Sequence, residues 1–245
     1  MKIVAITQAR LSSARFPKKV LEAINGHSLI QIQAARVARS KLLDRHLIAT
    51  SNDPSDIDLI THCKSSGIQV DSGSLSDVLG RFSEITTRMH LKPDDLIIRL
   101  TGDCPFVSPE LIDAVISNHL MKNPEYSCLS LDHWPRGFDV EVFSKFFVDK
   151  ADKETQDPYD REHVTPYIRE SLATSPNVVK ASGDSRFSGL RMCVDVPVDL
   201  QFLKELIDNE MAEKKKYLNA IDLCELALRL PSRCNEFVKQ NERKL

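Results

Sequence analysis

A loop rich in cations and hydroxyls follows the first apolar run of the chain. Residues 3–6 are all apolar, which is typical of a buried parallel strand. Within the next dozen residues the chain places Arg10, Ser12, Ser13, Arg15, Lys18 and Lys19. These side chains supply the donors that a polyphosphate needs, and α/β proteins bind ligands where strands end. The loop therefore predicts a nucleoside triphosphate site; the alternative is an ordinary solvated loop.

The same loop lacks the glycines of the common phosphate-binding motifs. It contains neither Gly-x-x-x-x-Gly-Lys-Ser/Thr nor Gly-x-Gly-x-x-Gly. If phosphate binds here, we expect side chains to hold it more than a glycine-rich backbone.

Two aspartates follow later apolar runs. Asp103 comes shortly after residues 96–100, and Asp195 comes directly after residues 191–194. A carboxylate beside a triphosphate usually holds magnesium, because the metal bridges phosphate oxygens and screens their charge. Both aspartates also fit structural roles: Asp103 in a turn and Asp195 as a cap before a helix that begins at Pro197.

A second polar group lies further along the chain. Asp139 and Glu141 alternate on one face of an expected strand, and Arg161, Glu162 and His163 cluster inside an expected helix. Together they could frame an acceptor substrate, with Arg161 or His163 contacting an anion. The alternative is a solvated strand face and a salt bridge within a helix.

Composition narrows the class of protein. The chain has 245 residues, a net charge of −2, 42% hydrophobic and 28% charged residues, which is typical of an ordinary globular protein. This balance favours neither nucleic acid nor a membrane surface as a partner. Six cysteines without a Cys-x-x-Cys pair give little support to structural zinc, and Cys104 has no adjacent histidine to make it a nucleophile. Without a secretion signal, we expect a cytoplasmic protein with reduced thiols.

The order of the elements predicts an α/β fold. Strands are expected at residues 3–6, 46–49, 68–70, 95–100, 126–129, 139–143, 178–181 and 191–194. Helices are expected at residues 28–40, 54–65, 74–89, 109–121, 157–172, 197–215, 219–230 and 232–239. The early alternation predicts a doubly wound, mostly parallel sheet. We expect one domain over residues 1–245, with an inserted lobe at about 126–175 for the acceptor or for dimerisation, and a helical extension at about 218–245.

Taken together, the motifs resemble the spore coat polysaccharide biosynthesis protein SpsF family. The resemblance covers about residues 1–210 and rests on QAR-x-x-S-x-R-x-P-x-K-V-L, DVLGRF, RLTGDCPF, DVEVF, REHVTPYI and VDVPVDL in that order. That family belongs to the cytidylyltransferase group, with the CMP-Kdo and CMP-acylneuraminate synthetases. It implies the Rossmann-like nucleotide-diphospho-sugar transferase fold, a three-layer α/β/α sandwich.

The resemblance also implies roles for individual residues. The triphosphate loop would use Arg10, Ser13, Arg15 and Lys19; magnesium would be held by Asp103 and Asp195; Gln8 and Ala9 would face the base; Asp77 and Arg99 would line the same cleft. The family loop usually reads Pro-Gly-Lys, and here it reads Pro17-Lys18-Lys19. Lys18 is therefore either tolerated in place of glycine or supplies an extra cation.

The implied reaction is magnesium-dependent transfer of CMP from CTP to a sugar acid related to nonulosonic acids, with release of pyrophosphate. The catalytic residues would be Arg10, Arg15, Lys19 and Asp103. The resemblance also suggests a homodimer. The rivals are a nucleotidyltransferase that uses a sugar phosphate, a glycosyltransferase that uses a nucleotide sugar, and a nucleotide-binding scaffold without turnover. Two metal carboxylates argue against the scaffold.

Overall fold

The centre of the molecule is one seven-stranded sheet in the order β5-β4-β1-β6-β8-β7-β9. The computed structural model describes residues 1–208 and 217–230. The strands are β1 (Ile3–Gln8), β4 (Arg45–Ser51), β5 (Val70–Gly73), β6 (Leu96–Thr101), β7 (Tyr126–Leu129), β8 (Glu141–Ser144) and β9 (Asn177–Val179). Only β8 among them runs antiparallel to its neighbours β6 and β7. The expectation of a mostly parallel sheet is confirmed.

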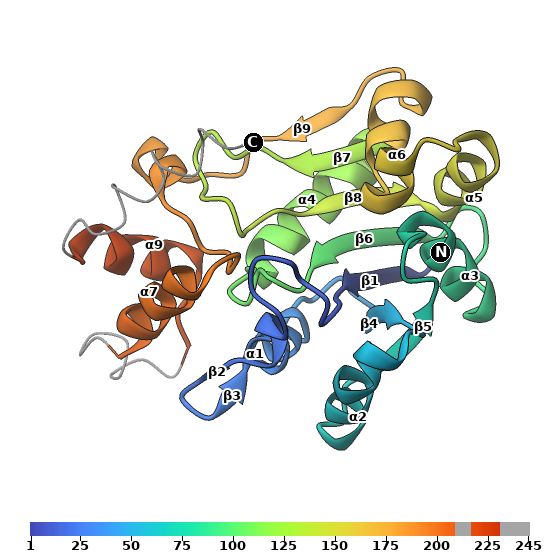
Figure 1. Ribbon diagram of the computed structural model, residues 1–245. Coiled ribbons are helices and arrows are strands. Elements are labelled where there is room, and N and C mark those ends of the chain that lie inside the picture. The colour runs from blue at the N-terminus through green and yellow to red at the C-terminus, as the bar shows by residue number, and fades with distance from the viewer. Residues whose placement is uncertain (209–216, 231–245) are drawn as a thin grey trace.

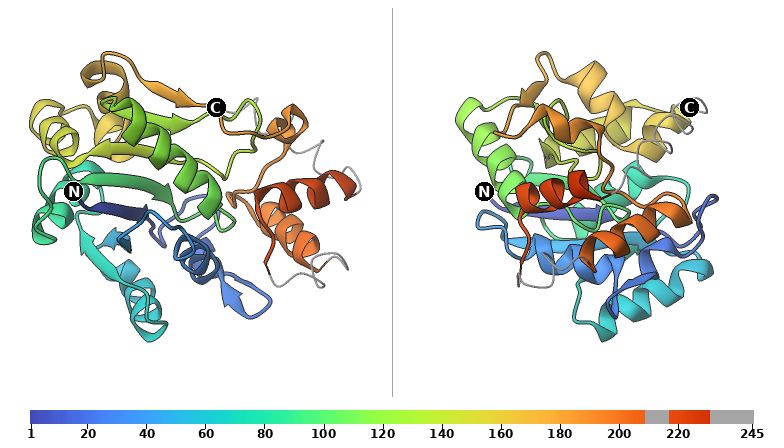
Figure 2. Two further views of the ribbon diagram at one scale, coloured as in Figure 1. Left: turned by 180° about the vertical axis from the view of Figure 1, so that it is seen from behind. Right: turned by 90° about the vertical axis from the view of Figure 1, so that its left-hand side faces the viewer.

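Helices cover both faces of the sheet (Figures 1 and 2). They are α1 (Leu29–Val37), α2 (Ile57–Ser65), α3 (Val78–Arg88), α4 (Pro109–Lys122), α5 (Lys145–Glu154), α6 (Pro158–His163), α7 (Pro197–Ile207) and α9 (Ala220–Arg229). A two-stranded hairpin, β2 (Ala23–Ile24) with β3 (His27–Ser28), precedes α1. The three-layer α/β/α sandwich agrees with the expected fold class.

Alternating side chains of β1 build the two cores. Ile3 and Ala5 pack with α1 and α4 on one face, whereas Val4 and Ile6 pack with α3 and α5 on the other. Because successive strand residues point to opposite faces, an unbroken apolar run is what a strand buried on both sides requires. The apolar start of the chain thus fixes β1 in the middle of the sheet.

The carboxyl ends of β1 and β6 point the same way, since the two strands pair in parallel. Beyond these ends lie α7 and α9, at the left in Figure 1. The loops that leave β1 and β6 therefore meet at one edge of the sheet, as expected for an α/β fold.

Two expected elements are different in the structure. The run at residues 191–194 forms no strand, only an isolated bridge between Arg136 and Arg191. Its backbone bonds go to two separate segments: Met192 N donates to Arg136 O, and Val194 N donates to Asp103 O, both at 2.8 Å. No continuous ladder can form from such divided pairing.

The expected helix at residues 157–172 is interrupted. α6 ends at His163, and a separate helical turn spans Ile168–Leu172. Between them Val164 adopts φ 70°, and Thr165 N donates to His163 O at 2.8 Å in a tight three-residue turn. Pro166, which has no N–H and restrains the residue before it, explains why a continuous helix is disfavoured.

Other boundaries shift by a few residues, and some elements were not expected. β5 begins at the end of the expected run 68–70, α3 starts four residues later than expected, and α5 and the β2–β3 hairpin are additional. β7 and β8, from the expected lobe at 126–175, join the central sheet. The expected helix 232–239 and the end of 197–215 lie outside the described residues. No helix in the described part of the chain combines the length and apolar character needed to cross a membrane.

Candidate functional site

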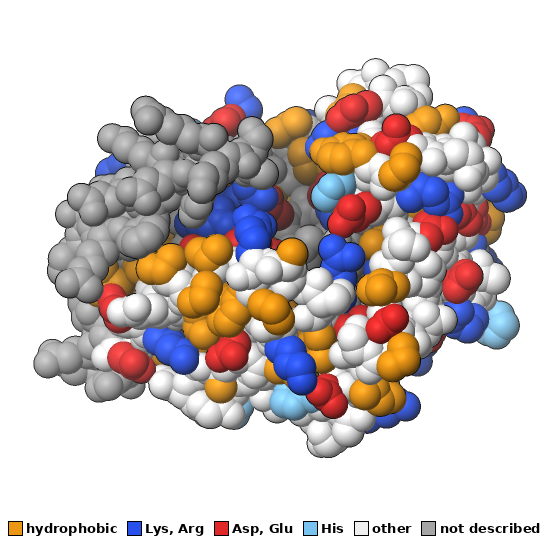
Figure 3. All heavy atoms as spheres, in the orientation of Figure 1, with side chains coloured by type: hydrophobic (Ala, Val, Ile, Leu, Met, Phe, Trp, Pro, Cys, Tyr) orange, Lys and Arg blue, Asp and Glu red, His pale blue; other side chains and the backbone are white. Residues whose placement is uncertain are grey.

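A cavity of about 690 Å³ opens where β1 and β6 end. Of the residues singled out from the sequence, Ser12, Lys18, Asp77 and Arg161 do not line it, whereas the others do: Gln8, Ala9, Arg10, Ser13, Arg15, Lys19, Arg99, Asp103, Asp139, Glu141, Glu162, His163 and Asp195. Figure 3 shows the surface hollowed here, with Lys and Arg side chains along the margin of the hollow. Segments far apart in sequence therefore converge on one cavity.

The cationic loop after β1 is anchored by a buried carboxylate. Asp56 has no exposed surface, and its Oδ1 accepts from Leu11 N at 2.6 Å. Its Oδ2 accepts from Thr50 Oγ1 and Ser51 N at 3.1 and 3.2 Å. A buried carboxylate that accepts several hydrogen bonds is well compensated. Asp56 thus fixes the start of the loop against the end of β4.

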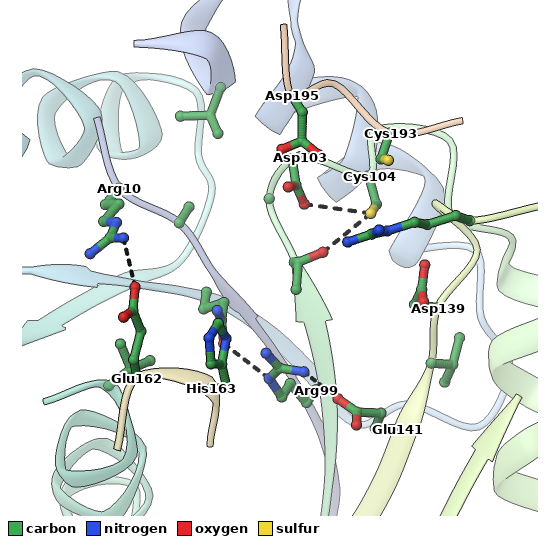
Figure 4. Close-up of a pocket in the computed structure, with 18 of the residues that line it drawn as sticks. Arg10, Arg99, Asp103, Cys104, Asp139, Glu141, Glu162, His163, Cys193 and Asp195 are labelled. Carbon is green, nitrogen blue, oxygen red and sulfur yellow. Dashed lines mark hydrogen bonds and ion pairs between the residues drawn. The ribbon is translucent and has the colours of Figure 1, made fainter. Parts of the chain in front are cut away.

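Lys19 links the two aspartates that follow later runs. Its Nζ donates to Asp103 Oδ2 at 3.1 Å and to Asp195 Oδ1 at 3.0 Å. Arg15 Nη2 reaches the same Asp195 oxygen at 2.9 Å, and Arg191 also pairs with Asp195. Figure 4 shows the two carboxylates side by side. The sequence thus brings a cation and two acids together from three separate segments.

Within this cluster the cations and the carboxylates each stabilise the charged form of the other. Burial lowers the pKa of Lys19, but the two aspartates outweigh burial and raise it. Burial raises the pKa of Asp195, but the neighbouring cations outweigh that and hold it below its usual value. Both groups are therefore charged at neutral pH, as an anion-binding or metal-binding site requires.

Gly102 allows the Asp103 loop to lie against β1. Its N–H donates to Gln8 O at 2.9 Å, and a Cβ on Gly102 would lie 2.8 Å from Ala9 Cβ. On the other side, Gln33 Nε2 donates to Thr101 O and Cys104 O at 2.7 and 2.9 Å. This close approach requires glycine, and the side-chain bonds hold Asp103 at the cavity.

The two cysteines beside the aspartates are not activated. Burial raises the pKa of the Cys104 thiol well above its usual value, and it raises that of Cys193 to about 12. Because the thiolate is the nucleophile, a thiol in this state is a poor one. The structure agrees with the sequence argument against a Cys104 nucleophile.

Glu141 lies in the cavity wall but is occupied by protein donors. Its carboxylate pairs with Arg99 and accepts from Tyr126 OH at 2.5 Å and Thr165 Oγ1 at 2.8 Å. Arg99 Nε in turn donates to Gln8 Oε1 at 3.0 Å. Burial raises the pKa of Glu141, but these donors outweigh it and lower the pKa overall. This network ties β8, β6 and β1 together beneath the cavity.

Asp139 has fewer partners. Its Oδ2 accepts from Gly137 N at 2.7 Å, and burial is the main cause of a raised pKa. In Figure 4 Asp139 and Glu141 lie on one side of the cavity, and Arg10, Glu162 and His163 on the other. Arg10 Nη2 pairs with Glu162 Oε1 at 3.1 Å. The cavity thus has two chemically distinct ends with Asp103 and Asp195 between them.

Asp77 and Arg161 lie outside the cavity lining, although the sequence singled them out. Asp77 caps α3 by accepting from Gly80 N at 2.8 Å, and Arg161 Nε donates to Asp77 Oδ1 at 2.8 Å. Arg161 Nη2 also pairs with Asp152 at 2.7 Å. In the described structure these residues join α6 to α3 and α5, a structural role made by ion pairs between helices and not within one helix.

Three cavity residues with charged side chains were missed by sequence reasoning: Arg81, Arg136 and Arg169. Arg81 belongs to the DVLGRF motif, from which only Asp77 was singled out, and of these two residues Arg81 lines the cavity. Arg136 and Arg169 carry no local signal, because only the tertiary fold brings them to the cavity.

The acids of the cavity suit a divalent cation that shares its ligands with a substrate. Within residues 1–208 and 217–230, no group of three or more His, Cys, Asp or Glu side chains is arranged to hold a metal ion. Asp103 and Asp195, however, both pair with the ammonium group of Lys19, so their two carboxylates lie close together. Mg²⁺ is usually bound by one or two carboxylates together with substrate phosphates. The residues present fit that arrangement rather than an all-protein site.

Comparisons with known proteins agree with one another. A family model described as cytidylyltransferase matches residues 4–224. The spore coat polysaccharide biosynthesis protein SpsF of Bacillus subtilis is 33% identical over 240 residues, which cover 96% of this chain and 97% of that protein.

Two solved structures share the fold. A cytidylyltransferase from Leptospira borgpetersenii has a TM-score of 0.80 at 24% identity, covering 99% of this chain and 96% of that one. The structure of CMP:2-keto-3-deoxy-manno-octonic acid synthetase complexed with CTP has a TM-score of 0.65 at 17% identity, covering 88% and 100%.

Proposed function

The chain belongs to the cytidylyltransferase family, and from that premise we propose that it transfers CMP from CTP to a sugar acid and releases pyrophosphate. As a member of the family it is a nucleotidyltransferase of the type that includes SpsF and CMP-Kdo synthetase, which serve sugar biosynthesis. The proposal adds the donor, the acceptor class and magnesium. A relative of the same fold was solved with CTP and is named for a sugar acid.

The observation that carries the proposal is the Lys19 cluster at the centre of the cavity. One ammonium and two carboxylates, with Arg15 beside them, suit a triphosphate and its metal. Asp103 and Asp195 would hold Mg²⁺, which when bound would neutralise phosphate charge and orient the phosphate oxygens. A binding module without turnover has no need of this arrangement.

The protein's own groups would act by position and charge. A hydroxyl oxygen of the acceptor attacks the α-phosphorus and its proton passes to water, the bond from that phosphorus to the oxygen bridging to the β-phosphate breaks, and pyrophosphate leaves. Arg15 and Lys19 stabilise the negative charge that grows on the leaving group, and Arg10 lies in the same loop. The loop holds the phosphates in line for this displacement.

We assign the acceptor to the end of the cavity with Asp139 and Glu141, whereas His163 lies on the other side, with Arg10 and Glu162. Asp139 can accept hydrogen bonds from sugar hydroxyls, since its carboxylate has only a backbone partner within the described residues. Arg136 and Arg169 line this cavity and supply the cations for a sugar carboxylate in place of Arg161.

The direct test measures pyrophosphate release with each of the four nucleoside triphosphates, a panel of sugar acids and sugar phosphates, and Mg²⁺ or EDTA. The proposal expects release that requires CTP, a sugar acid and Mg²⁺ together. Release only with sugar phosphates would replace the acceptor class. Formation of a nucleoside diphosphate from a nucleotide sugar would instead indicate glycosyl transfer and would overturn the proposal.

A further inference from the structure

Gln33 is a buried amide behind the Asp103 loop. It lies on α1, has no exposed surface and does not line the cavity. Its Nε2 donates to Thr101 O at 2.7 Å and to Cys104 O at 2.9 Å. One side chain therefore holds the backbone on both sides of Asp103.

The orientation of this amide leaves its oxygen without a partner. Both contacts of Nε2 are carbonyl oxygens, so only the NH2 group of the amide can meet them. Oε1 of Gln33 is buried with no hydrogen-bond donor among the described residues. A buried acceptor without a donor lowers the stability of the folded protein. An apolar side chain of the same size would avoid this loss.

The two carbonyls do not depend on Gln33 for a donor. Thr101 O also accepts from Cys104 N at 3.1 Å, and Cys104 O also accepts from Val107 N at 3.4 Å. A buried backbone carbonyl that keeps one donor is satisfied. Gln33 thus adds a second bond to each carbonyl, and what these bonds add is a fixed position for the turn that carries Asp103.

The position of this turn sets how two carboxylates lie relative to each other. Val194 N donates to Asp103 O at 2.8 Å, so the segment that leads into Asp195 is bonded to the same turn. The two carboxylates lie 3.1 and 3.0 Å from Lys19 Nζ. Gln33 restrains the turn from the α1 side. Because a metal ion needs its ligands in a defined geometry, groups that hold those ligands affect its affinity.

We propose that Gln33 is a positioning residue for the metal site. Through its bonds on both sides of Asp103, it places that carboxylate where it holds Mg²⁺ together with Asp195 and the triphosphate. Gln33 touches neither the substrate nor the metal and acts through Asp103. Loss of a group that orients a metal ligand typically lowers metal affinity by roughly 10–100-fold. This inference rests on the proposed binding of CTP and Mg²⁺.

The experiment measures the affinity for CTP by calorimetric titration without an acceptor, once with Mg²⁺ and once with EDTA. The ratio of the two affinities is the gain due to the metal. Gln33→Met fills a similar volume but cannot donate a hydrogen bond. For this variant we expect the affinity in EDTA to match the wild type and the gain due to Mg²⁺ to fall by about tenfold. A wild-type gain in folded Gln33→Met would overturn the inference.

Gln31→Met is the matched control on the same helix. Gln31 Nε2 donates to Ser66 Oγ at 2.9 Å, and Gln31 does not line the cavity. Its Oε1 accepts from Ser28 N at the start of α1, so Gln31→Met should unfold at a lower temperature and keep the wild-type gain. Gln33→Met should show the reverse, with an unfolding temperature close to the wild type and a reduced gain. A reduced gain in both variants would mean that the gain follows stability, and would overturn the inference.

If Gln33→Met does not fold, Gln33→Asn takes its place. Its amide is one methylene shorter and cannot reach both carbonyls, so a reduced gain is again expected. The wild-type gain in Gln33→Asn would overturn the inference and leave the proposed function intact. A wild-type protein that binds CTP equally well with Mg²⁺ and with EDTA would overturn the proposed metal as well, before any variant is compared.

Discussion

The charge of Asp103 is central to the proposed chemistry but contributes little to the stability of the fold. Its side chain is 27% exposed, and its contact with Lys19 is duplicated by Asp195. We therefore expect Asp103→Asn to fold normally and to lose most of the pyrophosphate release, by several kcal/mol of transition-state stabilisation. Asp58→Asn is the control, since Asp58 pairs with Lys18 on the surface. Unchanged Mg²⁺-dependent activity in folded Asp103→Asn would remove Asp103 from the mechanism.

Lys18 departs from the glycine of the related loop, and the structure shows the consequence. It adopts φ 59° and ψ 15°, in the left-handed region, and its Nζ pairs with Asp58 at 2.9 Å rather than lining the cavity. The left-handed conformation costs a non-glycine residue roughly 1–2 kcal/mol, partly offset in Lys18→Gly by the greater freedom of glycine in the unfolded chain.

We expect Lys18→Gly to raise the free energy of unfolding by up to about 1 kcal/mol and to retain activity. Urea denaturation and the Michaelis constant for CTP measure the two effects. Lys18→Ala is the control, because it loses the ion pair to Asp58 but keeps the strained backbone, and it should not be stabilised. A large loss of activity in a stable Lys18→Gly protein would place the lysine in the site.

The ion cluster around Asp195 makes stability depend on pH with a definite sign. Its pKa in the folded protein lies below the ordinary 3.8, so its ion pairs contribute above pH 3.8 and are lost as the pH falls through the folded value. Lys19 has a raised pKa and remains charged to beyond pH 10.5. We expect Asp195→Asn to lower the free energy of unfolding by about 3 kcal/mol at neutral pH.

Urea denaturation at a series of pH values measures the free energy of unfolding of the wild type and of Asp195→Asn. The difference between them should be constant from about pH 5 to 9 and should shrink below about pH 4. A difference that persists unchanged into acid would show that the pairs around Asp195 are not its cause.

At the scale of elements, Arg161 joins three helices. It donates to Asp77 at the start of α3, to Asp152 O and Oδ1 at 3.0 and 2.7 Å in α5, and to Thr155 O at 3.1 Å. We expect Arg161→Ala to lower the melting temperature by roughly 5–10 °C, from a loss of about 2–3 kcal/mol.

The Michaelis constants for the acceptor and for CTP, measured on the remaining activity, show whether Arg161 has a structural role or binds a substrate. In Arg161→Ala both Michaelis constants should match the wild type, since Arg161 does not line the cavity. Arg88→Ala, which removes a surface pair from α3, should change the melting temperature by much less. A raised Michaelis constant for the acceptor at normal stability would restore Arg161 to the site.

Sequence patterns predicted the elements where local and tertiary preferences agree. β1 and β6 are continuous apolar runs buried on both sides, and both were expected. The run at 191–194 looks similar, but its backbone bonds are divided between Arg136 and Asp103. The turn at Val164 arises from its neighbours and not from its own preference, since valine disfavours positive φ. These outcomes depend on contacts that no local window contains.

The site as a whole was predicted best where loops leave adjacent strands. Arg10 and Asp103, in the loops after β1 and β6, were expected to meet, and they line one cavity; Asp195 also lines it, although the run before it forms no strand. Asp77 and Arg81 belong to one helical segment, and the sequence alone cannot say which of the two faces inward. Position along a helix sets which side chains share a face, but packing against the sheet sets which face is buried. That choice needed the fold.

At the scale of the whole molecule, α9 packs into the hydrophobic core that also contains residues of the central sheet and of the segment after the Asp103 loop. Leu223 has no exposed surface and belongs to a cluster with Phe106 and Val107, which follow directly behind the Asp103 loop. Arg36 reinforces this junction by donating to Leu218 O and Val107 O, each at 3.0 Å. We therefore expect residues 1–208 and 217–230 to unfold as one cooperative unit rather than as a domain with an independent extension.

Leu223→Ala tests this cooperativity. Removing a buried leucine costs about 2–5 kcal/mol, which for a chain of this size lowers the melting temperature by on the order of 10 °C. If the extension shares the core, a calorimetric scan should show one transition shifted as a whole, and CTP binding should be lost at that lower temperature. Leu228→Ala on the same helix is the control, because Leu228 is 37% exposed and should shift the transition little. A new early transition with the main one left at the wild-type temperature would show that α9 is an independent extension.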